Sequence, residues 1–278
     1  MVEPFGMRLQ ERIRALGPLC VGVDPSRQLL ESWSRPDSIE GLEFFSLAVL
    51  EAVIDVAAVI KPQVSYFERF GSEGYRVLER LLQEARDADV LVVADAKRGD
   101  ILSSNDGYAQ AWLSDRSTLR VDALTVSPYA GVGALMPLID AAQSSGRGVF
   151  ILAATSNDEG RTLQRARSAD NERIEDMVLS KIGGINRRDD GLGSVGAVFG
   201  ATRDRPEFNL ASLGGPYLVP GIGAQGADAD RVSRLFERCP QGTVLATVSR
   251  AILQAGPDRA AIRDAAQRWR DELSRALL

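Results

Sequence analysis

The sequence predicts an α/β chain that folds as one (β/α)8 TIM barrel domain over residues 1–278, with an extra N-terminal helix and a charged helical insert after strand five. Three observations lead to this prediction. Short apolar segments alternate with helical patterns at a spacing of ~30 residues, which suits a barrel of ordinary size. Each segment is apolar nearly throughout, as in parallel strands that are covered on both faces. Polar residues directly follow several of these segments. A doubly wound open sheet shares the alternation and is the main alternative.

The extra N-terminal helix comes first, because apolar residues recur there at helical spacing. These residues are Phe5, Leu9, Ile13 and Leu16. The expected strands are the short apolar runs at 19–23, 57–61, 90–95, 122–126, 149–155, 195–200, 217–220 and 243–248. Helical patterns between them include 41–56, 71–87, 130–143 and 226–238. A final helix is expected at about 257–276, with one apolar stripe of Ile262, Ala266, Trp269 and Leu273.

The segment 156–194, after the fifth strand, is long and highly charged, as in RTLQRARSADNERIEDMV. Its pattern favours an extra amphipathic helix inserted into the barrel. The sequence shows no internal repeat, low-complexity tract or linker, and this favours one domain over two.

Composition narrows the class of protein. With 45% hydrophobic and 26% charged residues, the chain can build a sizeable core, so we expect a soluble globular protein. A net charge of −5 without a basic run argues against binding to nucleic acid or to an anionic membrane. No apolar run reaches the roughly 18 residues that a membrane span needs. The start, MVEPFGMRLQERIRALG, lacks the apolar core of a signal peptide, so a cytoplasmic location is expected.

The residue types that are present limit the chemistry. The chain contains no histidine, which excludes Ser-His-Asp and Cys-His catalysis and every metal site that needs histidine. Its two cysteines, Cys20 and Cys239, have no motif spacing and are expected to be reduced. Chemistry must therefore come from lysine, arginine, carboxylates, hydroxyls and the backbone.

The stretch VVADAKRGDI, residues 92–101, places three charges at the end of a predicted buried strand. Because side chains alternate along a strand, Asp95 and Lys97 are expected to point to the same side. Asp100 lies beyond Gly99 in the turn, so the strand pattern does not determine its direction. Taken alone, these charges are either a structural ion pair or part of a site.

Polar residues also follow the ends of other predicted strands. They are Asp24 after the first, Lys61 at the end of the second, Ser156 and Asn157 after the fifth, Gln225 after the seventh, and Ser249 and Arg250 after the eighth. The carboxyl ends of barrel strands form the face that carries active sites. Asp24 and Lys61 alone could be ion pairs at the rim of the barrel, so it is the whole assembly that indicates a site.

The stretch VPGIGAQGA predicts a phosphate-binding loop after the seventh strand. Its glycines, Gly221, Gly223 and Gly226, let backbone N–H groups approach an anion. Arg250, at the next strand end, could bind the phosphate in a bidentate manner. The alternatives are that the glycines only form turns, and that Arg250 caps a helix or pairs with Asp258.

Seven motifs together resemble the orotidine 5′-phosphate decarboxylase family. In order they are VGVDP, VIKPQ, ADAKRGDI, TVSPYAG, ATSND, VPGIGAQG and VSRAI, spread over residues 19–252. The chain length is similar to that of the longer bacterial members. The resemblance implies a barrel, an active homodimer, and conversion of orotidine 5′-phosphate to UMP and CO2 in pyrimidine biosynthesis without metal or organic cofactor.

The resemblance also implies residue roles. The family's charged tetrad would be Lys61, Asp95, Lys97 and Asp100, with Asp100 reaching into the partner subunit's site beside Ile101 and Ser104. The substrate contacts would be Asp24 and Lys61 at the ribose hydroxyls, Ser156 at the pyrimidine, and Gln225 and Arg250 at the phosphate, with Gly223 and Ser249 as further substrate-binding positions. Shorter members carry His-Pro or Asn-Pro after this serine, whereas this chain has Asn157-Asp158.

Loss of CO2 from C6 of the pyrimidine leaves a carbanion with no carbonyl positioned to delocalise it, so the site must stabilise charge and then deliver a proton. Lys97 suits both tasks as an ammonium beside C6, because neighbouring carboxylates favour its charged form. The same argument disfavours a Schiff-base aldolase, which needs a free amine. Asp95 beside the substrate carboxylate would disfavour the ground state by charge repulsion.

Two other functions are compatible with parts of this pattern. A Mg²⁺-dependent sugar-phosphate decarboxylase or synthase of the same superfamily would share DxKxxD and the phosphate loop. Such enzymes carry a Glu at the position of Lys61, and a cation there is unsuitable for holding Mg²⁺. A non-catalytic nucleotide-binding barrel would need the loop but not the charges from Asp95 to Asp100.

Overall fold

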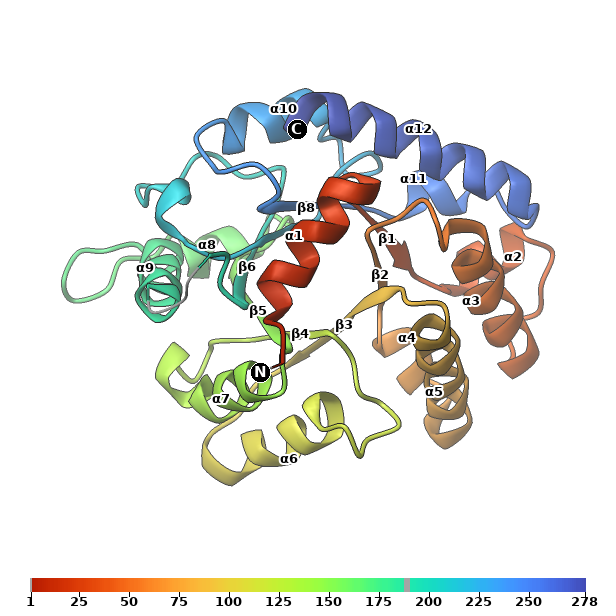
Figure 1. The fold of residues 1–278 in the computed structure, drawn as a ribbon, viewed down its shortest axis with the longest axis horizontal. Coiled ribbons are helices and arrows are strands. Elements are labelled where there is room, and N and C mark those ends of the chain that lie inside the picture. The colour runs from red at the N-terminus through yellow and green to blue at the C-terminus, as the bar shows by residue number, and fades with distance from the viewer. Residues whose placement is uncertain (1, 188–190) are drawn as a thin grey trace.

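The computed structural model of the chain describes residues 2–187 and 191–278, and its centre is a closed barrel of eight parallel strands (Figure 1). The strands follow one another around the barrel in chain order, and β8 pairs with β1 to close it. The predicted (β/α)8 fold is therefore confirmed, and the open-sheet alternative is wrong. The strands are β1 Leu19–Val23, β2 Val59–Pro62, β3 Leu91–Arg98, β4 Ala123–Val126, β5 Gly148–Ala154, β6 Val195–Phe199, β7 Tyr217–Val219 and β8 Val244–Val248.

Helices surround this barrel and bury the outer faces of the strands. They are α1 Phe5–Leu16, α2 Arg27–Ser32, α3 Ile39–Val53, α4 Ser65–Glu68, α5 Gly71–Asp87, α6 Leu102–Leu113, α7 Met136–Ser144, α8 Gly160–Gln164, α9 Ile174–Asn186, α10 Ala229–Phe236, α11 Arg250–Leu253 and α12 Arg259–Leu277. The described residues also form two 3₁₀ helices, η1 Val132–Leu135 and η2 Leu210–Ser212. No helix in the described ranges has both the length and the apolar character needed to cross a membrane.

Capping side chains explain why several predicted helices begin where they do. Asp228 accepts the N–H of Arg231 at the start of α10, and Asp258 accepts the N–H of Ala260 at the start of α12. Asp258 is therefore a helix cap, and the alternative that it pairs with Arg250 finds no support in its contacts.

The extra N-terminal helix α1 closes the amino-terminal end of the barrel. Figure 1 shows α1 lying across the centre of the ring of strands. Its residues Phe5, Leu9 and Ile13 are fully buried, and the Phe5 ring meets Phe150 of β5 edge to face at 5.9 Å. This end of the barrel is therefore filled with apolar side chains, and the pocket must open at the other end.

In its described residues, 156–187 and 191–194, the charged segment contains two helices rather than the single extra helix expected. The short α8 is followed by a loop in which Arg167 and Arg173 form an antiparallel bridge, and then by α9. Because α9 packs against β5 and β6, it is the barrel helix of this unit rather than an addition to it. In residues 200–216, all of which are described, the connection between β6 and β7 forms only the short η2.

Candidate active site

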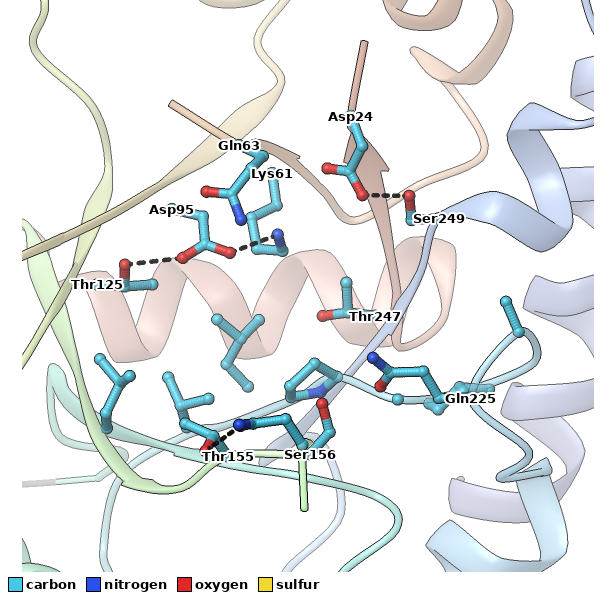
Figure 2. Close-up of a pocket in the computed structure, with 18 of the residues that line it drawn as sticks. Asp24, Lys61, Gln63, Asp95, Thr125, Thr155, Ser156, Gln225, Thr247 and Ser249 are labelled. Carbon is cyan, nitrogen blue, oxygen red and sulfur yellow. Dashed lines mark hydrogen bonds and ion pairs between the residues drawn. The ribbon is translucent and has the colours of Figure 1, made fainter. Parts of the chain in front are cut away.

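A pocket of about 290 Å³ lies at the carboxyl ends of the strands (Figure 2). Side chains on, or just after, every strand from β1 to β8 contribute to its lining. The lining includes eight of the site residues predicted from sequence, namely Asp24, Lys61, Asp95, Lys97, Ser156, Gln225, Ser249 and Arg250. The strand ends therefore bring together polar side chains that are far apart in the sequence.

Asp95 lies between two ammonium groups. Lys61 Nζ is 2.8 Å from Asp95 Oδ2, and Lys97 Nζ is 2.6 Å from Asp95 Oδ1. The two lysines differ in exposure, because the Lys61 side chain is 7% exposed and the Lys97 side chain 47%. Lys61 is therefore held within the wall, while Lys97 can reach a ligand in the pocket.

The charges of Asp95, Lys61 and Lys97 determine which of these side chains are ionised. Burial alone would raise the pKa of Asp95, but the nearby ammonium groups of Lys61 and Lys97 outweigh burial and lower that pKa. Burial alone would lower the pKa of Lys61, but the carboxylates of Asp95 and Asp24 outweigh burial and raise it. Asp95 is therefore ionised and Lys61 protonated at neutral pH.

Thr125 of β4 connects the backbone of Lys97 to this ionic group. Its Oγ1 accepts the backbone N–H of Lys97 at 3.0 Å and donates to Asp95 Oδ1 at 3.1 Å. Lys97 has a φ of +48°, a left-handed conformation that is unusual for a residue with a side chain. The pairing of β3 with β4 shifts register between Ala94 and Arg98, so a side-chain hydroxyl takes the place of a regular ladder bond at Lys97.

Asp24 and Ser249 face each other across the join between β1 and β8. Ser249 Oγ donates to Asp24 Oδ2, which leaves Asp24 Oδ1 buried with no hydrogen-bond partner among the described residues. Thr247 Oγ1, also in the pocket wall, is likewise buried without a partner there. Unpaired buried oxygens of this kind are available to hydroxyl groups of a ligand. Gly22 permits the contact, because a Cβ there would lie 2.7 Å from Ser249 Cβ.

The predicted phosphate loop follows β7. Gln225 from this loop and Arg250 at the start of α11 both line the pocket. Gly223 lies behind them, with a φ of +72° and its N–H donated to Ala227 O at 2.8 Å. A Cβ on Gly223 would come within 3.0 Å of Ala251 Cβ, so glycine is required for this turn.

Thr155, Ser156 and Asn157 form the opposite wall. Figure 2 shows Thr155 and Ser156 across the pocket from Lys61 and Asp95. The carbonyl of Ser156 accepts a hydrogen bond of 2.9 Å from Thr202 Oγ1 in the loop after β6.

Four predicted site residues do not line the pocket of their own chain: Gly223, in the turn of the loop after β7, and Asp100, Ile101 and Ser104. Asp100 is exposed, and its Oδ1 accepts the N–H of Ile101 at 2.7 Å. Ile101 is 54% exposed, and Ser104 lies on the exposed side of α6. Within one chain the expected tetrad is therefore a triad of Lys61, Asp95 and Lys97.

Several residues that line the pocket were not predicted from the sequence. Gln63, Thr125, Thr155 and Thr247 add polar groups, and Leu152, Val198, Leu218, Pro220 and Ile222 add an apolar surface. Thr125 and Thr247 each interrupt an apolar strand with a hydroxyl, which was a usable signal. The apolar residues have no such signal, because they look like any other barrel side chain.

Comparison with known proteins places these features in a family. Residues 17–265 match the model of the "Orotidine 5'-phosphate decarboxylase / HUMPS family". The chain is 49% identical to the orotidine 5′-phosphate decarboxylase of Salinispora tropica, over 96% of each chain, and 47% identical to that of Streptomyces coelicolor, over 99% of each. Among solved structures, one from Streptomyces avermitilis assigned to the same enzyme superposes with a TM-score of 0.95 at 46% identity, covering 100% of this chain and 97% of that one.

Proposed function

The chain belongs to the orotidine 5′-phosphate decarboxylase family, and we propose that its pocket converts orotidine 5′-phosphate to UMP and CO2 with the charges of its own side chains. The observation that carries this proposal is the carboxylate of Asp95 held between the ammonium groups of Lys61 and Lys97 at the pocket wall. This array supplies both a fixed negative charge and a mobile proton donor. We infer from it a carboxy-lyase activity in pyrimidine biosynthesis.

Lys97 acts as the catalytic acid. The C6–carboxylate bond breaks, its electron pair stays on C6, and a proton from Lys97 Nζ forms the new C6–H bond. Lys97 then regains a proton from solvent, which reaches this half-exposed side chain. Its positive charge also stabilises the carbanion before the proton moves.

Asp95 and Lys61 set the charge balance around that step. Asp95, whose pKa is lowered by the two lysines, faces the substrate carboxylate as an anion, and this repulsion disappears when neutral CO2 leaves. Lys61 is buried and keeps Asp95 paired throughout, so the site never contains an isolated buried carboxylate.

The remaining pocket residues bind the non-reacting parts of the nucleotide. Asp24, with its unpaired Oδ1, and Lys61, which also lines the pocket, bind the ribose hydroxyls. Ser156 on the opposite wall contacts the pyrimidine. Gln225 and Arg250 bind the phosphate, with Gly223 shaping the loop and Ser249 orienting Asp24. Binding energy from the phosphate is then used to orient the ring against Lys97.

A homodimer completes the site in this proposal. Large apolar side chains are exposed around the start of α6 and near α7. They are Ile101 (54% exposed), Leu102 (76%), Tyr129 (87%) and Met136 (36%). Such a patch favours association with a second copy. Asp100 lies within it, so a second copy seated there would receive Asp100 and Ser104 beside its own pocket.

The Mg²⁺-dependent alternative is disfavoured by the donor set. Asp95, the carboxylate nearest the reaction centre, is already paired with two ammonium groups, whereas Mg²⁺ requires oxygen ligands. A non-catalytic nucleotide-binding barrel would not need a proton donor as accessible as Lys97.

The proposal is tested by following the ultraviolet absorbance of orotidine 5′-phosphate in the presence of EDTA. We expect rapid loss by the wild type and none by Lys97→Ala, while the variant still binds UMP in a calorimetric titration. A Lys97→Ala protein that retained turnover would remove Lys97 from its role. A wild type that is active only with added Mg²⁺, on sugar phosphates, would overturn the proposed reaction.

A further inference from the structure

A side chain from the charged segment contacts the end of β5 beside the pocket. Gln164, the last residue of α8, accepts the backbone N–H of Thr155 at its Oε1 at 3.1 Å. Its Nε2 donates to Thr155 Oγ1 at 2.9 Å. Gln164 itself does not line the active-site pocket, so any influence on a ligand must pass through Thr155.

Arg203 dictates the orientation of the Gln164 amide. Arg203 is 4% exposed, and its Nη2 donates to Gln164 Oε1. A guanidinium can only donate hydrogen bonds, so the oxygen of Gln164 must face Arg203 and its nitrogen must face Thr155 Oγ1. A flipped amide would set two donors against each other.

This orientation is transmitted along a chain of hydrogen bonds into the pocket wall. Because Thr155 Oγ1 accepts from Gln164, its proton is donated to Asn157 Oδ1, at 2.7 Å. The Asn157 amide then presents its nitrogen to Glu159 Oε2, at 2.9 Å. Thr155 and Asn157 both line the pocket on either side of Ser156, so the chain determines which atoms this wall offers.

A buried carboxylate of the same segment lies close enough to Arg203 for their charges to interact. Glu175 of α9 is 3% exposed, and although burial raises its pKa, the positive charge of Arg203 opposes that shift. On the surface, Arg165 pairs with Asp204 at 3.1 Å, and this joins the charged segment to the loop that carries Arg203. The segment therefore supplies both Gln164 and part of the support for its partner.

We propose that Gln164, oriented by Arg203, is a positioning residue that fixes the hydrogen-bond direction of Thr155 and Asn157 and thereby sets recognition of the pyrimidine edge. The inference rests on the proposed function, which places the base against Ser156. It gives the charged segment 156–194 a role in substrate recognition. The residues proposed to bind the ribose and the phosphate follow other strands, so they do not depend on the hydrogen bonds from Gln164 to Asn157.

The test uses Gln164→Glu, which has the same size but accepts only. Its carboxylate still pairs with Arg203, so stability should be kept. However, Thr155 Oγ1 must now donate to Glu and can no longer donate to Asn157. We expect the Kd for UMP, measured by calorimetry, to rise roughly tenfold, as for one lost hydrogen bond. The Kd for ribose 5-phosphate, which has no base, should change less than about twofold, since its contacts are unaffected.

Two further variants sharpen the result. Gln164→Met removes both hydrogen bonds to Thr155 and should weaken UMP binding as well, with ribose 5-phosphate again unaffected. Gln83→Met, on the outer helix α5 where Gln83 donates to Asp87, is the matched control and should change neither Kd. Equal weakening of both ligands in Gln164→Glu, or no change for UMP, would overturn the inference while leaving wild-type turnover intact. Absence of wild-type turnover would instead overturn the proposed function and this inference with it.

Discussion

Replacing Thr125 with valine should shift the position of Lys97 without removing its positive charge. Valine keeps the shape of a side chain that is 1% exposed but removes the hydroxyl that accepts from Lys97 N–H at 3.0 Å and donates to Asp95 Oδ1 at 3.1 Å. Asp95 Oδ1 keeps its ion pair with Lys97 Nζ at 2.6 Å, so the main effect is that the backbone N–H of Lys97 loses its hydrogen-bond acceptor. A buried donor without a partner costs about 1–3 kcal/mol in the free energy of unfolding.

The effect on turnover should exceed the effect on binding. Lys97 has a φ of +48°, and without Thr125 nothing else described in the structure bonds its N–H in that conformation. Because a displacement of ~1 Å of a catalytic group can cost about 10²-fold in rate, we expect kcat of Thr125→Val to fall ~10- to 100-fold with KM changed less than about threefold.

Thr125→Ser is the control for this prediction. It keeps the hydroxyl and loses only a methyl group, at a cost of about 1 kcal/mol in stability, and should keep kcat within about threefold of wild type. Steady-state assays of orotidine 5′-phosphate loss and urea unfolding supply the two readouts. Equal kcat values for the valine and serine variants would refute the argument that the hydroxyl positions Lys97.

Three more predictions follow from the site. Lys61→Met leaves Asp95 buried beside a single lysine and should destabilise the protein by ~3–5 kcal/mol in urea unfolding at pH 7. The pKa of Asp95 is lower in the folded protein than in the unfolded chain, where it is about 3.9, so the ionised Asp95 stabilises the fold above that pH. The stability difference between wild type and Lys61→Met should therefore hold at neutral pH and shrink as acid protonates Asp95. A stability difference that persists in acid would contradict this prediction. Arg250→Ala should lower kcat/KM by ~10²-fold or more, and wild type should process the nucleoside without phosphate poorly; efficient turnover of that nucleoside would rule out the phosphate argument. Asp100→Ala and Lys97→Ala proteins, each inactive, should recover about one quarter of wild-type activity when refolded together in equal amounts. About half of the dimers that form are mixed, and one of the two sites in each mixed dimer is intact; no recovery would refute a shared site.

The strands and the central charges could be predicted because they follow from local patterns. Alternation along β3 places Asp95 and Lys97 on one side, and the structure joins them at 2.6 Å. The exposed position of Asp100 could not be predicted, because the turn after Gly99 has no fixed side-chain period. The hydroxyl of Thr125 is visible as an interruption of an apolar strand, but its hydrogen bond with Lys97 could not be predicted, because that bond depends on a register shift between β3 and β4.

The charged segment shows a different limit of sequence reasoning. Its ionic residues predicted an extra amphipathic helix, but α9 is the helix that packs on β5 and β6 as part of the barrel. However, Glu175 and Arg203 are buried at 3% and 4% exposure. Arg203 donates a hydrogen bond to Gln164, which lies 39 residues earlier in the chain. Long-range pairing of this kind depends on the closed barrel, and no window along the chain contains it.

Because helix α1 closes one end of the barrel, the pocket is open only at the other end. Because Phe5, Leu9 and Ile13 seal the opposite end, nucleotide, CO2 and water must all pass through the same mouth. The sealed floor is dry enough that burial raises the pKa of the Cys20 thiol to about 12. Lys61 and Asp95 are therefore hydrated from one direction only. A nucleotide that fills the mouth removes that last water contact, and the electrostatic forces between these charges and the substrate grow stronger at the moment of binding.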